Sequence, residues 1–324
     1  MSLPVFSEEE ILIIRQAQNL FENVINPRID VCARSFAQKC GLDAKGKVLS
    51  SYTPTEELIK NFFTSKAYTQ PLATIEVLEQ MSCNEKRPKY EHLPTGIYDR
   101  GALYPSLRDN EVFKEFFSSV YNQSIKGLGK GELLLTILFS DVVKGNGSDD
   151  HTIGSYSEET KTDKATCKGN EKSSYRIIDA LNEEYGLKKQ IGYTKSGRPQ
   201  YENRCIWHID NKKEVRSYFQ KLGNITVELD SLLKVWDNNT PEQRKQLIGC
   251  RIFRKYQAIG GWRYYTHYHE NKKTGEIKIA IIKEFDDDTL LRYLKFSPQT
   301  MRRGCTQAVG DGYTDTQVNK RSIK

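Results

Sequence analysis

The sequence lacks the features that define several large classes of protein. Its seven cysteines are scattered through 324 residues, and no two of them form a Cys-x-x-Cys pair. A structural zinc site needs close ligand pairs of that kind, and an odd, scattered set offers no disulfide framework. We therefore expect free thiols in a reducing compartment.

Long apolar runs and the marks of a secretory signal are also missing. The longest apolar stretch spans residues 133–139, which is far short of the roughly 20 residues that cross a bilayer. Acids at Glu8, Glu9 and Glu10 stand where a signal peptide carries basic residues. These absences predict a cytoplasmic protein with no membrane partner.

The composition is that of a folded protein with a moderate excess of positive charge. Hydrophobic residues make up 37 % of the chain, aromatic residues 10 % and charged residues 28 %, which is enough apolar material for a packed core. The length suits one large domain or two of ordinary size. A net charge of +7 fits a polyanionic partner such as DNA, but many proteins without one have a similar charge.

The first third of the sequence predicts helices. Ser7 and Glu10 form a capping box, and apolar residues then recur with the helical period as far as Ile25. Further helix starts are marked at Pro27, Thr53 and either Asp109 or Asn110. Residues 83–107, rich in proline, glycine and tyrosine, separate the last two as a long connection. Residues 1–125 are therefore expected to form a helical N-terminal region.

The remainder predicts a mixed α/β core over residues 126–300 and a polar, loosely packed tail over residues 301–324. Strands are expected at 262–269 and 276–282, joined by a hairpin turn at 271–275. Helices are expected at 175–185, 215–222, 229–236 and 240–247, a short helix or turn at 286–296, and a short strand at 205–209. Residues 144–174 contain few large apolar side chains, which predicts an exposed loop or irregular strand. The fold class is thus α+β, a helical part followed by a mixed core with a central sheet.

The glycine-rich stretch at residues 126–132 does not meet the requirements of a nucleotide-binding loop. A P-loop needs Gly-Lys followed by Ser or Thr after a strand, whereas Lys130 is followed by Gly131 and Glu132. The spacing also fails to match Gly-x-Gly-x-x-Gly. The stretch instead predicts a turn that leads into a helix, with Glu132 in its first turn, where a negative charge suits the helix dipole.

Glu132 opens a series of carboxylates that continues with Asp149 and Asp150 and ends with Glu159 and Lys161. A helical Glu, an Asp after a turn and a Glu-x-Lys about ten residues later form a pattern that resembles the PD-(D/E)xK nucleases of restriction systems and phages. The alternation of Glu159 and Lys161 would place both side chains on one face of a strand. The resemblance covers residues 126–176, lacks the Pro before the Asp, and has polar residues around Glu159.

The resemblance implies a magnesium site and a nuclease reaction. Glu132, Asp149 or Asp150, and Glu159 would hold Mg²⁺, which activates water and neutralises charge on the phosphate. Lys161 would orient the attacking water, so Glu159 and Lys161 would be the catalytic residues. The alternative without a functional site is that Glu132 only stabilises a helix N-terminus and that the other residues of the series lie in a solvated loop.

Two other pairs of residues compete for a functional role. Glu276 and Lys278 repeat the Glu-x-Lys spacing in a more apolar strand, but no metal-binding acid lies just upstream, which favours an ordinary charge pattern on the solvent face. His267 and His269 share a face of their strand, and two His at positions i and i+2 can bind zinc. No third ligand is evident, so an aromatic strand with polar alternates is the favoured interpretation.

These observations lead to two principal hypotheses for function. The first is a metal-dependent nuclease-like protein that acts on DNA, of the kind that phages encode, located in the host cytoplasm or in the virion. The second is a non-enzymatic virion or DNA-packaging component in which the nuclease-like site is degraded. A protein-binding adaptor that uses the helical N-terminal region is a third class. Convergence of the carboxylates in space would favour the first hypothesis over the second.

Overall fold

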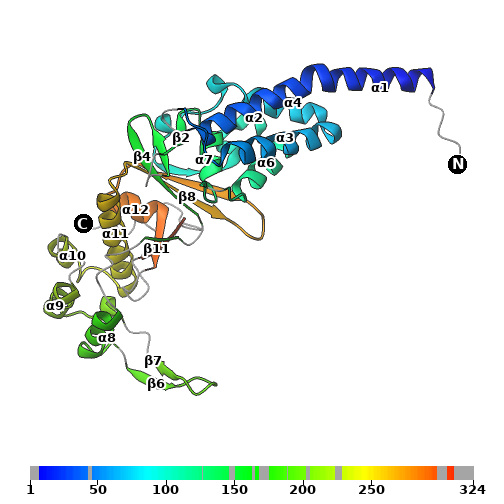
Figure 1. The fold of residues 1–324 in the computed structure, drawn as a ribbon. Helices are drawn as coiled ribbons and strands as arrows, with labels where there is room; N and C mark the ends of the chain where they lie inside the picture. The colour runs from blue at the N-terminus through cyan, green and yellow to red at the C-terminus, as the bar shows by residue number, and fades with distance from the viewer. Residues whose placement is uncertain are drawn as a thin grey trace.

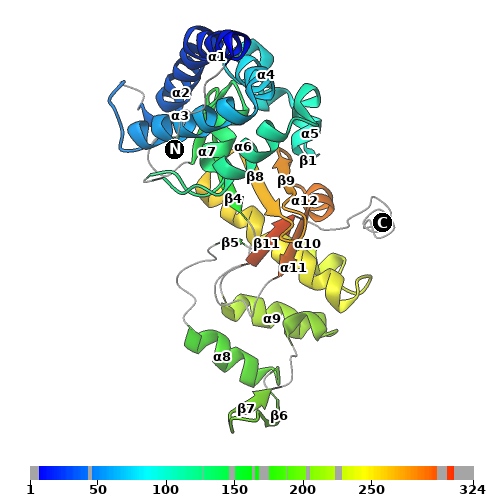
Figure 2. The ribbon, with the colours of Figure 1, turned by 90° about the vertical axis from the view of Figure 1, so that its right-hand side faces the viewer.

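A six-stranded sheet lies between a helical N-terminal layer and a second, mostly helical layer formed by the C-terminal half of the chain (Figures 1 and 2). The computed structural model describes residues 7–42, 46–125, 127–145, 150–162, 165–167, 175–187, 189–201, 205–222, 228–297 and 305–309. The order of the elements, with a helical part first and a mixed core around the six-stranded sheet after it, confirms the α+β class.

The N-terminal helices begin largely where the capping signals predict. The Ser7 backbone N–H donates to the Glu10 carboxylate, and the Glu10 N–H donates to the Ser7 hydroxyl. The chain passes from the first helix through a π-helical turn at Phe21–Ile25 into the second, and the third begins at Tyr52, one residue before the predicted cap. The main helices of this layer are α1 (Glu8–Leu20), α2 (Asn26–Gly41), α3 (Tyr52–Thr69), α4 (Pro71–Met81), α6 (Glu111–Tyr121) and α7 (Glu132–Leu138).

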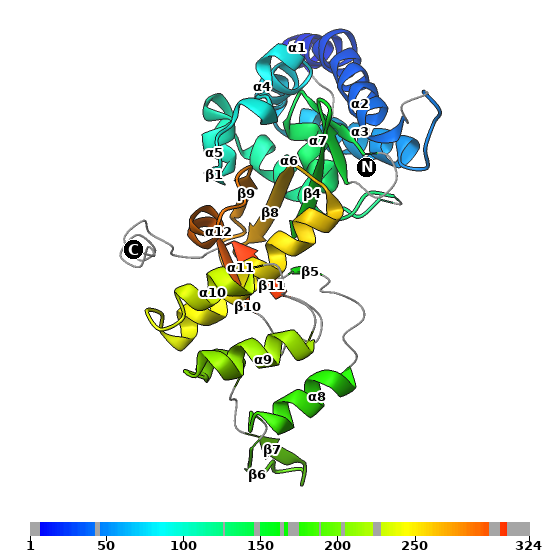
Figure 3. The ribbon, with the colours of Figure 1, turned by 90° about the vertical axis from the view of Figure 1, so that its left-hand side faces the viewer.

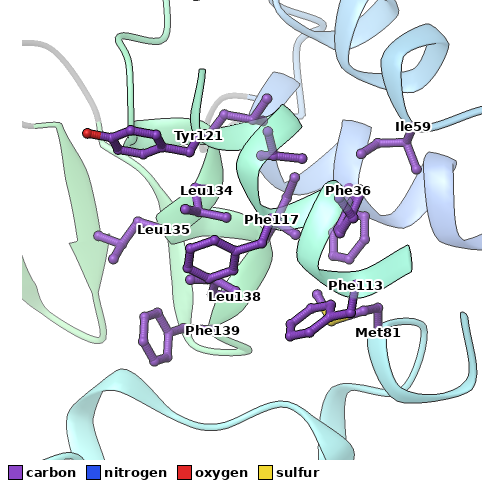
Figure 4. Close-up of a cluster of buried hydrophobic side chains, with 14 of the residues drawn as sticks. Phe36, Ile59, Met81, Phe113, Phe117, Tyr121, Leu134, Leu135, Leu138 and Phe139 are labelled. Atoms are coloured by element: carbon purple, nitrogen blue, oxygen red, sulfur yellow. The ribbon is translucent and has the colours of Figure 1, made fainter. Parts of the chain in front are cut away.

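An aromatic core holds these helices together. Figure 4 shows Phe36 of α2, Phe113 and Phe117 of α6 and Leu134 of α7 gathered between the helices, and all four are buried. Each such side chain contributes about 1.5–3 kcal/mol when it leaves water. Lys39 of α2 ties the core to the end of α7, because its ammonium group donates to carbonyl oxygens there.

Residues 83–107, expected as a long connection, contain several short elements. They are the 3₁₀ turns Asn84–Lys86, Tyr90–His92 and Pro105–Leu107, the strand β1 (Gly96–Tyr98) and the helix α5 (Arg100–Leu103). Strand β1 pairs with the edge of the central sheet. The sheet therefore includes one strand from the N-terminal region.

The other five strands of the sheet come from the second part of the chain. They are β2 (Val142–Lys144), β3 (His151–Ile153), β4 (Tyr156–Thr162), β8 (Tyr264–Glu270) and β9 (Ile277–Ile282). The first three form an antiparallel meander, β8 lies parallel to β4, and β9 returns antiparallel to β8 across the predicted hairpin. The prediction of an exposed loop or irregular strand is wrong for residues 151–162, because β4 is a central strand with buried polar side chains.

Alternating side chains of the sheet face two separate hydrophobic cores. Tyr264 and Tyr268 of β8 pack with the N-terminal helices, whereas Tyr265 packs with the C-terminal layer. On β4 the register places Glu158 beside Tyr264 and Glu159 beside Tyr265. Glu158 therefore faces the N-terminal layer, and Glu159 faces the C-terminal layer.

The C-terminal layer contains the predicted helices and two smaller sheets. Its helices are α8 (Tyr175–Glu184), α9 (Lys212–Leu222), α10 (Leu229–Lys234), α11 (Pro241–Gly260) and α12 (Asp287–Tyr293). Its strands are β5 (Ala165–Cys167), β10 (Leu294–Ser297) and β11 (Cys305–Val309), which pair together, and the separate hairpin of β6 (Gln190–Tyr193) and β7 (Pro199–Tyr201).

Three expectations for this half of the chain need correction. The predicted strand at 205–209 is wrong, because Ile206–His208 form a 3₁₀ turn whose Ile206 and Trp207 side chains are buried. Helix α11 continues well beyond residue 247 to Gly260, and the next residue, Gly261, caps it in a left-handed conformation. Part of the predicted loose tail forms strand β11, and the residues after 309 lie outside the described ranges.

Candidate metal site on the central sheet

Asp150, Glu159 and Lys161 meet on the face of the sheet that is turned toward the C-terminal layer. His151 of β3 lies opposite Glu158 of β4 in antiparallel register, so the preceding residue, Asp150, lies across from Glu159 and shares its face. The Lys161 ammonium lies 3.6 Å from Oδ2 of Asp150 and forms an ion pair with Glu159. The sequence prediction that Glu159 and Lys161 share one face of a strand is confirmed.

Oxygen atoms surround the Lys161 ammonium on several sides. Besides the two carboxylates, the carbonyl oxygen of Thr160 accepts a hydrogen bond from Nζ at 3.0 Å. Oδ2 of Asp150 also accepts the backbone N–H of Thr160 at 2.8 Å, which fixes the orientation of that carboxylate. These oxygens define one point at the sheet surface that favours a cation.

The three side chains are less exposed than the polar sequence suggested. The exposed fraction is 11 % for the Glu159 side chain, 22 % for Asp150 and 25 % for Lys161. Tyr256 of α11 covers Glu159 and donates its hydroxyl to Oε1. This tyrosine lies 97 residues further along the chain, and no local pattern in the sequence marks it.

Partial burial and mutual charge shift the pKa values at this site. Burial raises the pKa of Asp150, although Lys161 and the Thr160 N–H act in the opposite direction. Burial alone would lower the pKa of Lys161, but the carboxylates of Asp150 and Glu159 raise it above the usual value. Lys161 thus stays protonated. Its single ammonium group faces the two carboxylates of Asp150 and Glu159, so the three side chains together carry a net negative charge.

Glu132 lies at the start of α7, as predicted, but its carboxylate is held separately. The glycine-rich stretch does run as a loop into a helix, with Gly131 in the left-handed conformation just before Glu132. The Gly129 N–H donates to the Glu132 carboxylate, whose pKa is raised by burial and further by the charge of Asp150. Glu132 is therefore within electrostatic reach of Asp150 without joining the group around Lys161.

The ligand set in the described part of the chain is small. Among those residues, no three or more His, Cys, Asp or Glu side chains are placed to hold a metal ion together. Asp149, the other predicted ligand, lies outside the described residues. Mg²⁺ retains several waters and is commonly held by one or two carboxylates together with substrate phosphates. Asp150, Glu159 and the Thr160 carbonyl fit that smaller requirement.

A buried polar network, which the sequence did not reveal, lies directly behind this group. Nδ1 of His151 is 2.8 Å from Oε2 of Glu158, and both side chains are fully buried. The other ring nitrogen, Nε2, is 2.9 Å from the carbonyl oxygen of Glu132, and the Thr160 hydroxyl donates to Glu158. The network fixes the pairing of β3 with β4 one residue away from Asp150 and Glu159, and it attaches α7 to the same strands.

The charge state of His151 depends on its carboxylate partner. Burial on its own lowers the pKa of an imidazole, but the hydrogen bond and charge of Glu158, with the Glu132 carbonyl, raise the pKa of His151 overall. The imidazolium and carboxylate therefore stabilise each other inside the protein.

The two other residue pairs considered from the sequence, Glu276 with Lys278 and His267 with His269, lie on strand β9 and strand β8 or next to them. Glu276 is exposed just before β9, and Lys278 is partly exposed on that strand, as the charge-pattern interpretation predicts. His267 is fully buried and its Nδ1 lies 2.8 Å from the Tyr265 hydroxyl. Its place beside Lys161 in the β4–β8 register puts it on the same face as the acid group.

Comparison with known proteins yields no relative. No family model, curated protein or solved structure matches the chain. Within the described residues, every helix is either too short or too polar to traverse a lipid bilayer.

Proposed function

We propose that the protein is a metal-dependent nuclease that acts on DNA, with its active site at Asp150, Glu159 and Lys161. The observation that carries the proposal is the convergence of these three side chains on one face of two adjacent strands. They come from the positions that the PD-(D/E)xK resemblance implies, an Asp after a turn and a Glu-x-Lys on the next strand. The net charge of +7 suits a polyanionic substrate.

Each side chain has a distinct role in this proposal. Asp150 and Glu159, with the Thr160 carbonyl, would hold Mg²⁺, which when bound lowers the pKa of water and neutralises charge on the phosphate. Lys161, protonated beside the two carboxylates, would donate a hydrogen bond to the attacking water or to a phosphate oxygen. Tyr256 fixes Glu159 through its hydroxyl, so that the carboxylate keeps its orientation when Lys161 moves toward the substrate. Glu132 would act at longer range through its charge.

The second hypothesis, a virion or DNA-packaging component with a degraded site, has one observation in its favour. The described residues contain no third carboxylate in contact with this group, and many nucleases hold two ions. In both hypotheses the protein works beside DNA, in the host cytoplasm or in the virion. They differ in whether phosphodiester bonds are cut.

A cleavage assay with a matched control distinguishes the two. Purified protein is incubated with plasmid and linear DNA in Mg²⁺ or Mn²⁺, with EDTA as the metal-free control. The test variant is Glu159→Gln/Lys161→Met, because the isosteric Gln keeps the partly buried Glu159 site filled. The control variant, Glu276→Gln/Lys278→Met, changes the same residue types at the same spacing at the start of β9.

The proposal predicts EDTA-sensitive cutting by the wild type and by the control variant. The test variant should be slower by about 10²- to 10³-fold, as expected when electrostatic stabilisation of the transition state is removed. Its thermal unfolding curve should show that it is folded. Equal cutting by wild type and test variant would place the active site elsewhere, and DNA binding without cutting by any form would favour the structural component.

A further inference from the structure

The β6–β7 hairpin is a basic arm at the end of the molecule opposite α1 (Figures 2 and 3). Every residue from 189 to 200 is exposed except Gly192, which is partly so. Residues 189–201 include Lys189, Lys195 and Arg198 but no acidic residue. None of the three cations forms an ion pair within the described part of the chain.

Exposed apolar side chains accompany these charges. Tyr193 is 68 % exposed and Ile191 is 57 % exposed. Tyr193 lies opposite Pro199 across the hairpin, next to the turn that carries Lys195 and Arg198. Ile191 and Tyr193 thus add apolar surface next to the cations, and an aromatic ring beside positive charges suits stacking on a base or sugar.

The chain on both sides of the hairpin is packed into the C-terminal layer. Leu187, just before β6, and Trp207, soon after β7, are both buried in the second core. Helices α8 and α9 flank the hairpin and are joined by hydrogen bonds from the Tyr185 hydroxyl to Ser217 and from the Tyr218 hydroxyl to Asn182. The hairpin that carries the charges is thus held at both ends by packed parts of the chain.

We propose that this hairpin binds the sugar–phosphate backbone of DNA, with Lys189, Lys195 and Arg198 on phosphates and Tyr193 packed against a sugar or base. Cations without a protein partner form strong, sequence-independent contacts with phosphates, and aromatic side chains add stacking. The choice of DNA as the polyanion rests on the proposed function. The hairpin extends from the C-terminal layer (Figure 3). The register of β4 with β8 turns the Glu159 face of the sheet toward that same layer, so one extended DNA molecule could contact both.

The test measures DNA binding in EDTA, so that it does not depend on cleavage. A short fluorescein-labelled duplex is titrated with the full chain, and the anisotropy is followed over a series of salt concentrations. The test variant is Lys195→Ala/Arg198→Ala. The matched control is Lys272→Ala/Lys273→Ala, which removes the same amount of charge from another exposed hairpin turn, between β8 and β9.

The proposal predicts that the hairpin variant binds DNA about tenfold or more weakly than wild type. Its slope of log K against log salt should fall by about 1 for each phosphate contact removed, and the control should match wild type. Equal weakening in both variants would show that only net charge matters, and unchanged binding in the hairpin variant would exclude the hairpin. Either result overturns the proposal, as does absence of binding by the wild type. Wild-type binding that depends on the hairpin, without cutting in Mg²⁺, would leave this proposal standing and overturn the nuclease.

Discussion

Replacing one member of the buried His151–Glu158 pair should destabilise the protein strongly. In His151→Leu, the Glu158 carboxylate keeps the Thr160 hydroxyl but loses its only imidazole partner at a site with no exposure to water. Breaking a buried ion pair in this way costs about 3–5 kcal/mol, because a charge is left uncompensated. We expect a loss of that size in the free energy of unfolding, measured by urea denaturation with an unchanged slope.

The double variant His151→Leu/Glu158→Leu provides the decisive comparison. It removes both charges and fills the space with apolar groups, a replacement that is often close to neutral. The double variant should therefore be more stable than the two single losses would predict if they were additive. A loss below about 1 kcal/mol in His151→Leu, or strict additivity, would refute the conclusion that the two side chains form a charged pair.

The same pair should make stability depend on pH. The pKa of His151 is raised in the folded state, so its contribution is fully present below the unfolded value of about 6.5. That contribution is lost as the pH rises through the raised pKa of the folded protein. The difference in unfolding free energy between wild type and Glu158→Leu should therefore be largest in mild acid and shrink toward alkaline pH. A difference that grows with pH would contradict the assignment.

Two further predictions test the packing of the protein interior. Gly131→Ala should destabilise the protein by more than Gly186→Ala. Both glycines have positive φ, which costs an alanine about 1–2 kcal/mol, but of the two only Gly131 has neighbouring side chains, at 2.9 Å, that a Cβ would meet. Equal losses of stability in thermal unfolding would refute this steric clash at Gly131. The thiols of Cys32, Cys40 and Cys250 are buried, and burial raises their pKa. They should therefore resist a disulfide reagent in the native protein and react only after denaturation. Rapid reaction of these thiols in the native protein would show that they are not buried.

The parts of the fold that the sequence predicts well are those set by local interactions. The capping box at Ser7, the Asn110 cap of α6 and the hairpin turn before β9 each depend on residues a few positions apart. The glycine stretch likewise predicts the loop into α7, because glycine readily adopts the left-handed conformation that Gly131 has in the turn just before the helix. Such signals are complete within a short window of sequence.

The burial of β4 and its central place in the sheet could not be predicted, because the partners of this strand are distant in the sequence. Its sequence is polar, and polar residues with no visible partner predict exposure. In the folded protein the polar groups are satisfied by His151 across the sheet and by Tyr256 from α11, which a local pattern cannot show. The same distance explains why the Glu-x-Lys pattern predicted a shared face but not its degree of burial, nor the separate position of Glu132.

The most direct test of the central claim is the binding of a divalent cation, because it does not require the correct DNA substrate. Mn²⁺, which accepts the same carboxylate and carbonyl ligands as Mg²⁺, is titrated into wild type and Asp150→Asn and followed by calorimetry. The account predicts binding by the wild type that Asp150→Asn weakens by about tenfold or more, since half of the carboxylate set is removed. Equal binding by both proteins, or no binding by the wild type, would contradict it.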